Sequence, residues 1–416
     1  MRAMKDSGVE WLGQVPAGWS VAPGKRILTP LQRPVRDDDG VVTCFRDGEV
    51  TLRTNRRTEG FTVALKEIGY QGIEPGDLVV HGMDGFAGSI GISDSRGKAS
   101  PVLNVLDSDQ DKRFLMYYMR GLAYRDVYMA LSDGIRVRSC NLSWKKISNL
   151  MFALPDRDEQ SRIADFLDAK CAEVDRAVSA AEQSIQEYKA YKNSVVFQAV
   201  TKGLDPDAPM KDSGVEWLGP VPSNWKIIPS KTAFYESKQK RLSGDERLTP
   251  SQNYGVVTQS EYMRITGSKI VLADKGLDDW KHVEPLDFII SLRSFQGGLE
   301  MSRVSGCVTW HYIVLRSKID VHHDYFRFLF KSVAYIDGLR STCQYLRDGQ
   351  DLRYSNFVQV PLPLPPLDDQ RRIADFLDAK CAEIDRIVEA KQAIIDELKS
   401  YKQSLIYEAV TGKLEV

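Results

Sequence analysis

Two long stretches of the chain repeat apolar residues at the three- and four-residue spacing of a helix that buries one face. Between Gln160 and Thr201 there is neither proline nor glycine, and Leu154-Pro155-Asp156 upstream can end a strand and start a helix. At about 1.5 Å per residue this stretch predicts a rod of roughly 60 Å. The chain ends in a second stretch of the same kind, so the pattern predicts two long helices.

The apolar positions follow a heptad, which is typical of helices that pack against each other. They include Leu167, Val174, Val178, Ile185 and Tyr188 in the first helix, and Leu377, Ile384, Val388, Ile395 and Leu398 in the second. Lys192, Lys391 and Lys402 interrupt the series. Because neither apolar face can bury itself, we expect the helices to form an antiparallel coiled coil, as duplicated halves about a two-fold axis do. The alternative is that each helix packs only on its own globular domain.

Two segments of the chain occur twice. Residues 4–19 return as residues 210–225 with 13 of 16 positions identical, and residues 160–176 return as residues 370–386 with 15 of 17 identical. The repeats predict two halves, each with an opening segment, a variable globular stretch and a long helix. We therefore expect domains at 1–153 and 206–363, and repeated coiled-coil helices at 154–205 and 364–416.

The two globular stretches share only scattered features. Each has an apolar strand-like run after an acidic turn, at residues 76–80 and 286–290, and each continues into a glycine-containing loop. The helical segments have stayed alike while the globular stretches have diverged. This contrast indicates one common role for the helices and two different roles for the globular heads.

The net charge of -1 hides an uneven distribution. The heads carry an excess of positive charge, with 19 Lys+Arg against 16 Asp+Glu in residues 20–153 and 19 against 15 in residues 226–363. The remaining segments are acidic, with 8 against 13 in residues 154–225 and 8 against 11 in residues 364–416. Mildly basic heads favour contact with phosphate, although an ordinary solvated surface would give a similar excess.

The basic residues of the heads cluster together with amide side chains. Arginine paired with asparagine or glutamine reads guanine and adenine edges, while further Lys and Arg position the DNA backbone. The candidate DNA-binding residues are Arg53, Asn55, Arg56, Arg57, Arg96, Lys98, Arg136, Arg138, Lys145, Lys240, Arg241, Arg293, Arg303, Arg340, Gln344, Arg347 and Arg353.

Catalytic and metal-binding patterns are missing from the sequence. There is no phosphate-binding G-x-x-x-x-G-K-[ST] loop, no Asn/Asp-Pro-Pro-aromatic signature of an amino-methyltransferase and no C-x-x-C pair. We therefore expect no catalytic residue, no metal site and no cofactor bound by this chain. No run of about 18 apolar residues occurs, and the amino terminus lacks the apolar stretch of a secretory signal, so we expect a cytoplasmic protein.

The order of these motifs resembles a known family. Each half carries SGVEWLG-x-VP, then a variable stretch, then Leu-Pro and (Glu/Asp)-Gln before IA-x-FLD, with Glu159-Gln160 in the first half and Asp369-Gln370 in the second. This order, present twice and covering the whole chain, resembles the specificity subunit of type I restriction-modification enzymes. The aspartate at position 369 is a small departure, because glutamate is commoner there.

The resemblance implies an α+β fold with two target recognition domains, each a twisted and mainly antiparallel sheet with helices, separated by the antiparallel coiled coil in a pseudo-two-fold repeat. Each domain would read one half of a split double-stranded DNA sequence, and the helices would set the spacing. Such a subunit is not catalytic. It docks two methyltransferase subunits that use S-adenosylmethionine, and it can join two restriction subunits that use ATP and Mg. The rival interpretations are a coiled-coil scaffold with two divergent heads and no nucleic-acid role, and a fused enzyme with its own chemistry.

Overall fold

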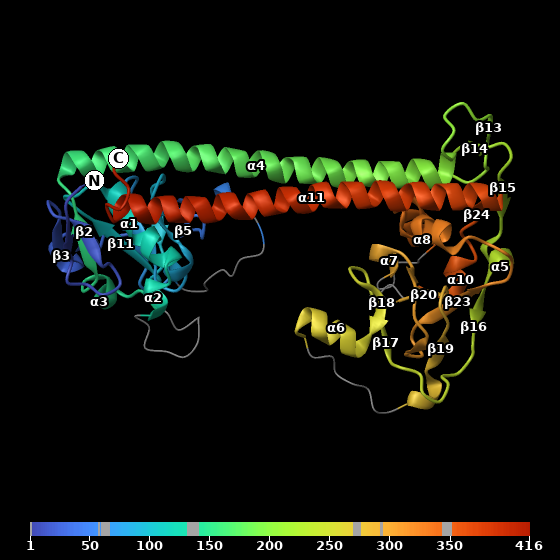
Figure 1. The fold of residues 1–416 in the computed structure, drawn as a ribbon. Helices are drawn as coiled ribbons and strands as arrows, with labels where there is room; N and C mark the ends of the chain where they lie inside the picture. Colours follow the sequence, from blue (N-terminus) through green and yellow to red (C-terminus); the bar gives the residue numbers. More distant parts are fainter. Residues whose placement is uncertain are drawn as a thin grey trace. The chain divides into compact units, whose positions relative to one another are not determined.

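Two compact units make up the computed structural model of this chain (Figure 1). The structure describes residues 2–56, 59, 67–130, 141–268, 276–291, 294–342 and 352–416. The first unit contains residues 1–182 and 392–416, and the second contains residues 183–391. The division cuts both long helices, so each unit holds one head, a part of α4 (Arg157–Lys202) and a part of α11 (Leu367–Val410).

Local signals explain where the long helices begin and end. Asp156 precedes α4 and its side chain accepts a hydrogen bond from the backbone N of Glu159 at 2.8 Å, as a helix N-cap does. Acidic residues occupy the first turn of both helices, where their negative charge interacts favourably with the helix dipole and stabilises the helix. Just past the helix ends, Gly203 and Gly412 have φ of 77° and 69°, a left-handed conformation that terminates helices and suits glycine.

The head of the first unit is built on a four-stranded antiparallel sheet in the order β4-β11-β8-β9. Two-stranded pairs β1-β2, β3-β12, β5-β6 and β7-β10 surround it. The strands are β1 (Met4–Asp6), β2 (Gln14–Pro16), β3 (Ser20–Pro23), β4 (Thr29–Pro30), β5 (Val42–Cys44), β6 (Val50–Leu52), β7 (Gln71–Ile73), β8 (Leu78–His81), β9 (Ile90–Ile92), β10 (Gly97–Ala99), β11 (Leu103–Asp107) and β12 (Met151–Leu154). The helices are η1 (Gly24–Arg26), η2 (Arg53–Asn55), η3 (Gly85–Ala87), α1 (Lys112–Tyr124), α2 (Val127–Ala130) and α3 (Trp144–Ile147).

The head of the second unit repeats this topology. Its four-stranded sheet has the order β16-β23-β20-β21, and its pairs are β13-β14, β15-β24, β17-β18 and β19-β22. The strands are β13 (Met210–Lys211), β14 (Val221–Pro222), β15 (Lys226–Ile228), β16 (Phe234–Ser237), β17 (Leu248–Ser251), β18 (Gly255–Thr258), β19 (Lys281–Val283), β20 (Phe288–Ile290), β21 (Glu300–Met301), β22 (Gly306–Val308), β23 (Ile313–Ser317) and β24 (Leu362–Leu364). The helices are α5 (Ser230–Ala233), α6 (Gln259–Thr266), η5 (Leu277–Asp279), α7 (Ser294–Gly297), α8 (His323–Lys331), α9 (Val333–Ser341) and α10 (Tyr354–Phe357).

The two apolar runs seen in the sequence are central strands with both faces buried. In β8, Leu78 and Val80 belong to one core cluster and Val79 to another. In β20, Phe288 and Ile290 face one cluster and Ile289 faces a second. A continuous apolar run, in place of strict alternation, is typical of such a strand. The α+β class and the internal repeat predicted from the sequence are confirmed.

The long helices run antiparallel within each unit. In the first unit, Lys402 Nζ lies 2.6 Å from Asp175 and Lys399 Nζ lies 3.3 Å from Glu182, so position rises along α4 as it falls along α11. The second unit has the equivalent pair, Lys192 Nζ to Asp385 at 2.6 Å. Two lysines that interrupt the heptad therefore reach carboxylates of the other helix, with their stems along the apolar face.

Most of the predicted coiled-coil residues are buried. Leu167, Val174, Val178, Ile185, Leu377, Ile384 and Ile395 are buried, and Tyr188, Val388 and Leu398 are half-buried. The ends of the helices also enter the cores of the heads. The first core includes Leu167 and Val410, and the second includes Leu377 and Val200, so each head packs on the start of one helix and the end of the other.

Candidate nucleic-acid interface and docking surfaces

A buried glutamine fastens each head to the start of a long helix. Gln160 Oε1 accepts a hydrogen bond from the backbone N of Asp111 at 3.1 Å, and its Nε2 donates to the carbonyl of Pro155 at 3.0 Å. Gln370 makes the same two bonds, from the N of His322 at 2.8 Å and to Pro365 at 2.9 Å. Asp111 and His322 are the residues that precede α1 and α8. The repeated Leu-Pro and Gln motif is thus a latch, the Gln160 latch in one unit and the Gln370 latch in the other.

An ion pair supports each latch about two turns further along the helix. Asp168 accepts hydrogen bonds from Tyr117 Oη at 2.7 Å and from Arg113 Nη1 at 2.8 Å, both residues of α1. Burial of the phenol, together with this bond, raises the pKa of Tyr117, which keeps it a donor. The equivalent Asp378 accepts from Arg327 of α8. The repeated FLD sequence therefore supplies one apolar anchor and one carboxylate to each head.

The acidic turns before the central strands hold buried carboxylates. Asp77 is 3% exposed and pairs with both terminal nitrogens of Arg33, while Asp287, also 3% exposed, pairs with Arg316 Nη2 at 2.8 Å. The hydrogen bond to each aspartate raises the pKa of its arginine. Because removing one partner would leave a buried charge, these arginines are structural.

The structure groups several candidate DNA-binding residues of the first head around β5, β6 and β10. Arg53 and Asn55 form η2, Arg56 follows it, and Arg96 and Lys98 lie at β10, whose Lys98 bridges to Val41 beside β5. Lys145 lies apart, exposed in α3. Arg57, Arg136 and Arg138 lie outside the described residues.

Many of these cations have carboxylate partners within the same head. Arg56 Nη1 lies 2.7 Å from Asp47 and 2.9 Å from Glu49, Arg96 pairs with Asp39 at 3.1 Å, and Lys98 pairs with Glu67 at 2.7 Å. The hydrogen bond to Asp47 raises the pKa of Arg56. The pairs of Arg56 are exposed, and such a pair contributes only about 0–1 kcal/mol, so phosphate can replace these carboxylates at little cost. Asp39 is buried, so Arg96 is held more firmly.

The candidates of the second head lie on several different elements. Lys240 bridges to β19 and pairs with Asp279 of η5 at 2.8 Å, and Arg241 is exposed beside it. Arg303 follows β21 and pairs with Asp324, Arg340 pairs with Asp337 within α9 at 2.9 Å, and Arg353 precedes α10. Arg293, Gln344 and Arg347 lie outside the described residues.

Each head also has a polar groove that the sequence did not reveal. The groove of the first head has a volume of about 870 Å³ and is lined in part by Gln32, Tyr70, Gln71, Asn104 and Trp144. The groove of the second head has about 370 Å³, with Thr249, Gln252, Asn253, Ser291 and Tyr312 among its lining residues. Amides and hydroxyls beside aromatic rings can bond to base edges. Their contributors are far apart in the sequence, so no local motif could have indicated them.

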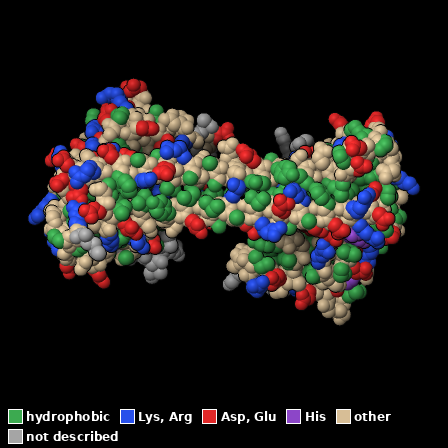
Figure 2. Space-filling view, turned by 45° about the horizontal axis from the view of Figure 1, so that its top comes forward, with side chains coloured by type: hydrophobic (Ala, Val, Ile, Leu, Met, Phe, Trp, Pro, Cys, Tyr) green, Lys and Arg blue, Asp and Glu red, His purple; other side chains and the backbone are tan. Residues whose placement is uncertain are grey.

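A patch at equivalent positions occurs on the helices of both units. The first patch consists of Phe166, Lys170, Glu173 and Tyr401, and the second of Phe376, Lys380, Glu383 and Tyr191, which are the equivalent positions of the repeat. Each lysine pairs with its glutamate at 2.9 Å, and Tyr191, Phe376 and Tyr401 are 49%, 41% and 53% exposed. Phe166 is half-buried against the first core. Figure 2 shows hydrophobic side chains gathered along the helical pair. Exposed aromatic residues in such a patch are typical of protein interfaces.

Two other kinds of site are absent from the described ranges. No group of three or more His, Cys, Asp or Glu residues there is arranged to hold a metal ion. None of the helices in those ranges is both long enough and apolar enough to cross a membrane.

Comparisons with known proteins agree with the geometry. Residues 222–400 match the family described as the type I restriction modification DNA specificity domain. A protein of Methanocaldococcus jannaschii named as the MjaX specificity subunit of a type I restriction enzyme is 21% identical over 314 residues, covering 73% of this chain and 68% of that protein.

Two solved structures have a similar fold. One comes from a study of complex assembly and conformational transition of the type I restriction-modification system, with a TM-score of 0.69, 14% identity and coverage of 96% of this chain and 99% of that chain. The other is the HsdS subunit from Thermoanaerobacter tengcongensis, with a TM-score of 0.51, 15% identity and coverage of 96% and 98%. Both likenesses extend over nearly the whole chain and include both heads.

Proposed function

We infer that this chain belongs to the type I restriction-modification specificity-subunit family and supplies the DNA specificity of such a complex. The observation that carries the inference is the unequal repeat. The latches, the Lys402–Asp175 and Lys192–Asp385 ion pairs and the helical patches recur at equivalent positions in both units, whereas the surfaces of the heads differ. A chain that binds two copies of one partner protein through its helices, and two different DNA half-sites through its heads, would show like helices and unlike heads.

Each head reads one half of a bipartite double-stranded DNA target. The heads share one strand order but present different side chains, with Arg53, Asn55 and Arg56 in the first and Lys240 and Arg241 in the second. Lysine and arginine that exchange an exposed carboxylate for phosphate position the duplex, and the amide-lined grooves contact base edges.

The helical pair fixes the spacing between the half-sites. The helices α4 and α11 continue without a break through 46 and 44 residues, and their register is set by the apolar heptad and by equivalent Lys-to-Asp pairs. A latch at the start of each helix transmits this register to one head.

The two equivalent helical patches dock two methyltransferase subunits. These partners bind S-adenosylmethionine and modify the DNA, and two restriction subunits that use ATP and Mg complete the full complex. The chain itself binds no cofactor and carries out no bond-breaking step. Its lack of the sequence motifs for nucleotide binding and adenine methylation supports this division of work.

Selection of DNA from a random pool tests the proposal. The chain is mixed with its methyltransferase partner and random duplexes, the retarded complex is isolated from a gel, and the bound DNA is sequenced. We expect two short conserved blocks separated by unspecified base pairs. A single continuous block, or no enrichment, would contradict the proposed function.

A further inference from the structure

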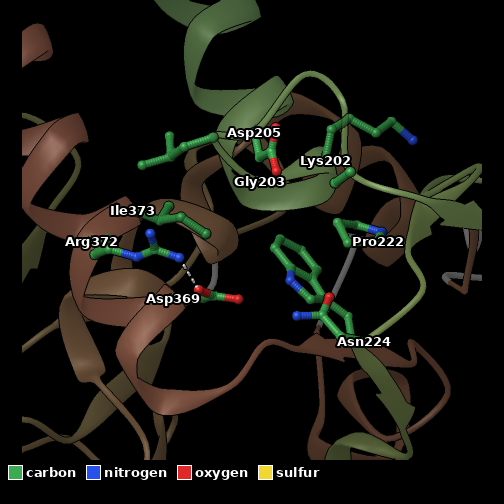
Figure 3. A pocket seen from close by; sticks show the side chains of 11 residues that line it. Lys202, Gly203, Asp205, Pro222, Asn224, Asp369, Arg372 and Ile373 are labelled. Carbon is green, nitrogen blue, oxygen red and sulfur yellow. Dashed lines mark hydrogen bonds and ion pairs between the residues drawn. The ribbon is translucent and has the colours of Figure 1, made fainter.

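The second unit has a pocket at a place that the first unit fills. The pocket has a volume of about 260 Å³ and lies between the end of α4, the following opening segment and the start of α11. Figure 3 shows Asp369 and Arg372 of α11 joined on one wall, with Pro222 and Asn224 of the opening segment on another. Trp225, which is 2% exposed, also lines it.

An arginine occupies the corresponding place in the first unit. There the guanidinium of Arg2 lies 5.6 Å from the ring centroid of Trp19 and pairs with Glu159, whose Oε2 is 2.8 Å from Arg2 Nη2. The indole Nε1 of Trp19 donates to the same carboxylate at 3.2 Å. The bond to Glu159 raises the pKa of Arg2. The first unit therefore contains this site in its occupied form, with a guanidinium group bound beside a tryptophan and a carboxylate.

Two substitutions and a looser closure leave the site empty in the second unit. Ala208 stands at the repeat position of Arg2, and Asp369 stands at that of Glu159 with a side chain one methylene shorter. Among the described residues, the carboxylate of Asp369 is paired with Arg372 and not with the indole. The backbone also lies less tightly against the tryptophan in the second unit. A Cβ added at Gly203 would lie 3.4 Å from the Trp225 ring, whereas a Cβ added at Gly412 would lie 3.1 Å from the Trp19 ring.

Two carboxylates of the pocket, those of Asp205 and Asp369, can bind a cation if the two cations that also line it, Lys202 and Arg372, are engaged elsewhere. Lys202 is already engaged, since its Nζ donates to the carbonyls of Leu218 and Pro220, and burial lowers its pKa. The side chain of Arg372 is 74% exposed, so it can leave Asp369 for solvent when another guanidinium arrives.

We propose that this pocket binds the guanidinium group of an arginine side chain presented by the methyltransferase subunit that docks on the second unit. The choice of partner rests on the proposed function and on the position of the pocket next to the second docking patch. Arg372 at the pocket, Phe376 and Lys380 follow one another at four-residue spacing on α11, so the pocket opens onto the helix face that carries the second docking patch. Planar guanidinium fits a carboxylate beside an aromatic ring better than the ammonium of lysine does.

The chemistry of the pocket is tested with small probes on the full chain. The protein is labelled with 5-fluorotryptophan, the Trp225 resonance is assigned from Trp225→Phe, and N-acetyl-arginine amide is titrated in. We expect a saturable shift of the Trp225 resonance and none at Trp19, whose site is filled by Arg2. N-acetyl-lysine amide should bind more weakly, and Asp369→Asn should weaken the arginine probe about tenfold. No shift at Trp225, or equal binding of the lysine probe, would overturn the proposal.

The partner is tested by filling the pocket from within. In the double variant Ala208→Arg/Asp369→Glu the chain supplies its own guanidinium, so the arginine probe should no longer shift Trp225. Calorimetry with the methyltransferase subunit should still show two sites, with one weakened about tenfold relative to the unaltered chain. Unchanged affinity at both sites would overturn the choice of partner. If the unaltered chain self-associates and the double variant does not, the arginine comes from a second copy of the chain, which would also overturn that choice. Failure of the unaltered chain to bind the methyltransferase at all would overturn the proposed function, while the probe titration independently decides the pocket chemistry.

Discussion

Equivalent residues of the two halves allow single side chains to be compared in matched surroundings. Glu159 and Asp369 differ by one methylene, yet one closes a site together with Trp19 and Arg2 and the other leaves a pocket beside Trp225. Gln160 and Gln370 show the opposite case. They keep the same two backbone partners although the residues that follow Asp111 and His322 are different.

Loss of a latch should destabilise its unit strongly. Gln370→Leu keeps the size of the side chain but leaves the half-buried N–H of His322 and the buried carbonyl of Pro365 unpaired, and an unpaired buried group costs about 1–3 kcal/mol. We expect the free energy of unfolding to fall by about 2–4 kcal/mol in guanidinium chloride titrations. Gln392→Leu, at an exposed position of the same helix, is the control and should change it by less than about 0.5 kcal/mol. Equal effects of the two variants would show that the latch contributes nothing.

The arginines of the first head should act on one half-site only. Replacing Arg53, Arg56 and Arg57 together by alanine is expected to reduce discrimination at the half-site read by the first head and to leave the other block unchanged. Sequencing of selected DNA measures both blocks in one experiment. Equal loss at both half-sites would count against one recognition domain per half-site.

At the scale of elements, periodicity indicated the helices well and the sheets poorly. The helical period is a local property, so α4 and α11 could be predicted from it. Their antiparallel sense was predicted from the duplication and a two-fold axis. The short strands of the heads were visible only where both faces are buried, as in β8 and β20. The order β4-β11-β8-β9 depends on pairings such as Thr29 with Asp107, which are too distant in sequence to leave a periodic signal.

The inter-helix ion pairs should couple measurably. Lys402→Glu places two carboxylates where Lys402 and Asp175 now meet, so it should destabilise the first unit, and adding Asp175→Lys should restore the attraction. A double-mutant cycle in denaturant is expected to give a coupling of about 0.5–1 kcal/mol, since both side chains are partly exposed. Additive effects of the two reversals would contradict the pairing.

The loop after β8 should make the first unit sensitive to acid. His81 Nδ1 accepts hydrogen bonds from the backbone N of Met83 and Asp84, at 3.2 and 3.0 Å, and burial lowers its pKa. A lowered pKa means that the full contribution to stability is present above the ordinary histidine value of about 6.5 and is lost as pH falls below it. We expect His81→Asn, whose carbonyl can accept but does not titrate, to flatten thermal stability between pH 7 and 5. An unchanged slope would refute this.

For the whole molecule, the repeat in the sequence is also a repeat of the packing between heads and helices. Each unit combines a head with the start of one long helix and the end of the other, so residues near the two chain termini share the first core. Leu12 and Trp19 pack there with Ile406 and Val410, as Leu218 and Trp225 pack with Val200 in the second.

Lengthening both helices should alter the spacing and nothing else. A seven-residue insertion that preserves the heptad, placed at matched positions of α4 and α11, adds about 10 Å to each helix, or about three base pairs of duplex. We expect methylome sequencing to find the same half-sites with a spacer longer by about that amount. Altered half-sites would show that the heads and the helices are not independent.

The chain's own sequence was sufficient for the duplication, the helical pair, its antiparallel sense and the resemblance to a family, because each rests on local periodicity or on motifs that recur in order. The latch partners, the amide-lined grooves and the difference between the Trp19 and Trp225 sites emerged only from the folded chain. They join residues separated by tens to hundreds of positions, and such meetings depend on how strands and helices pack, which no short stretch of sequence specifies.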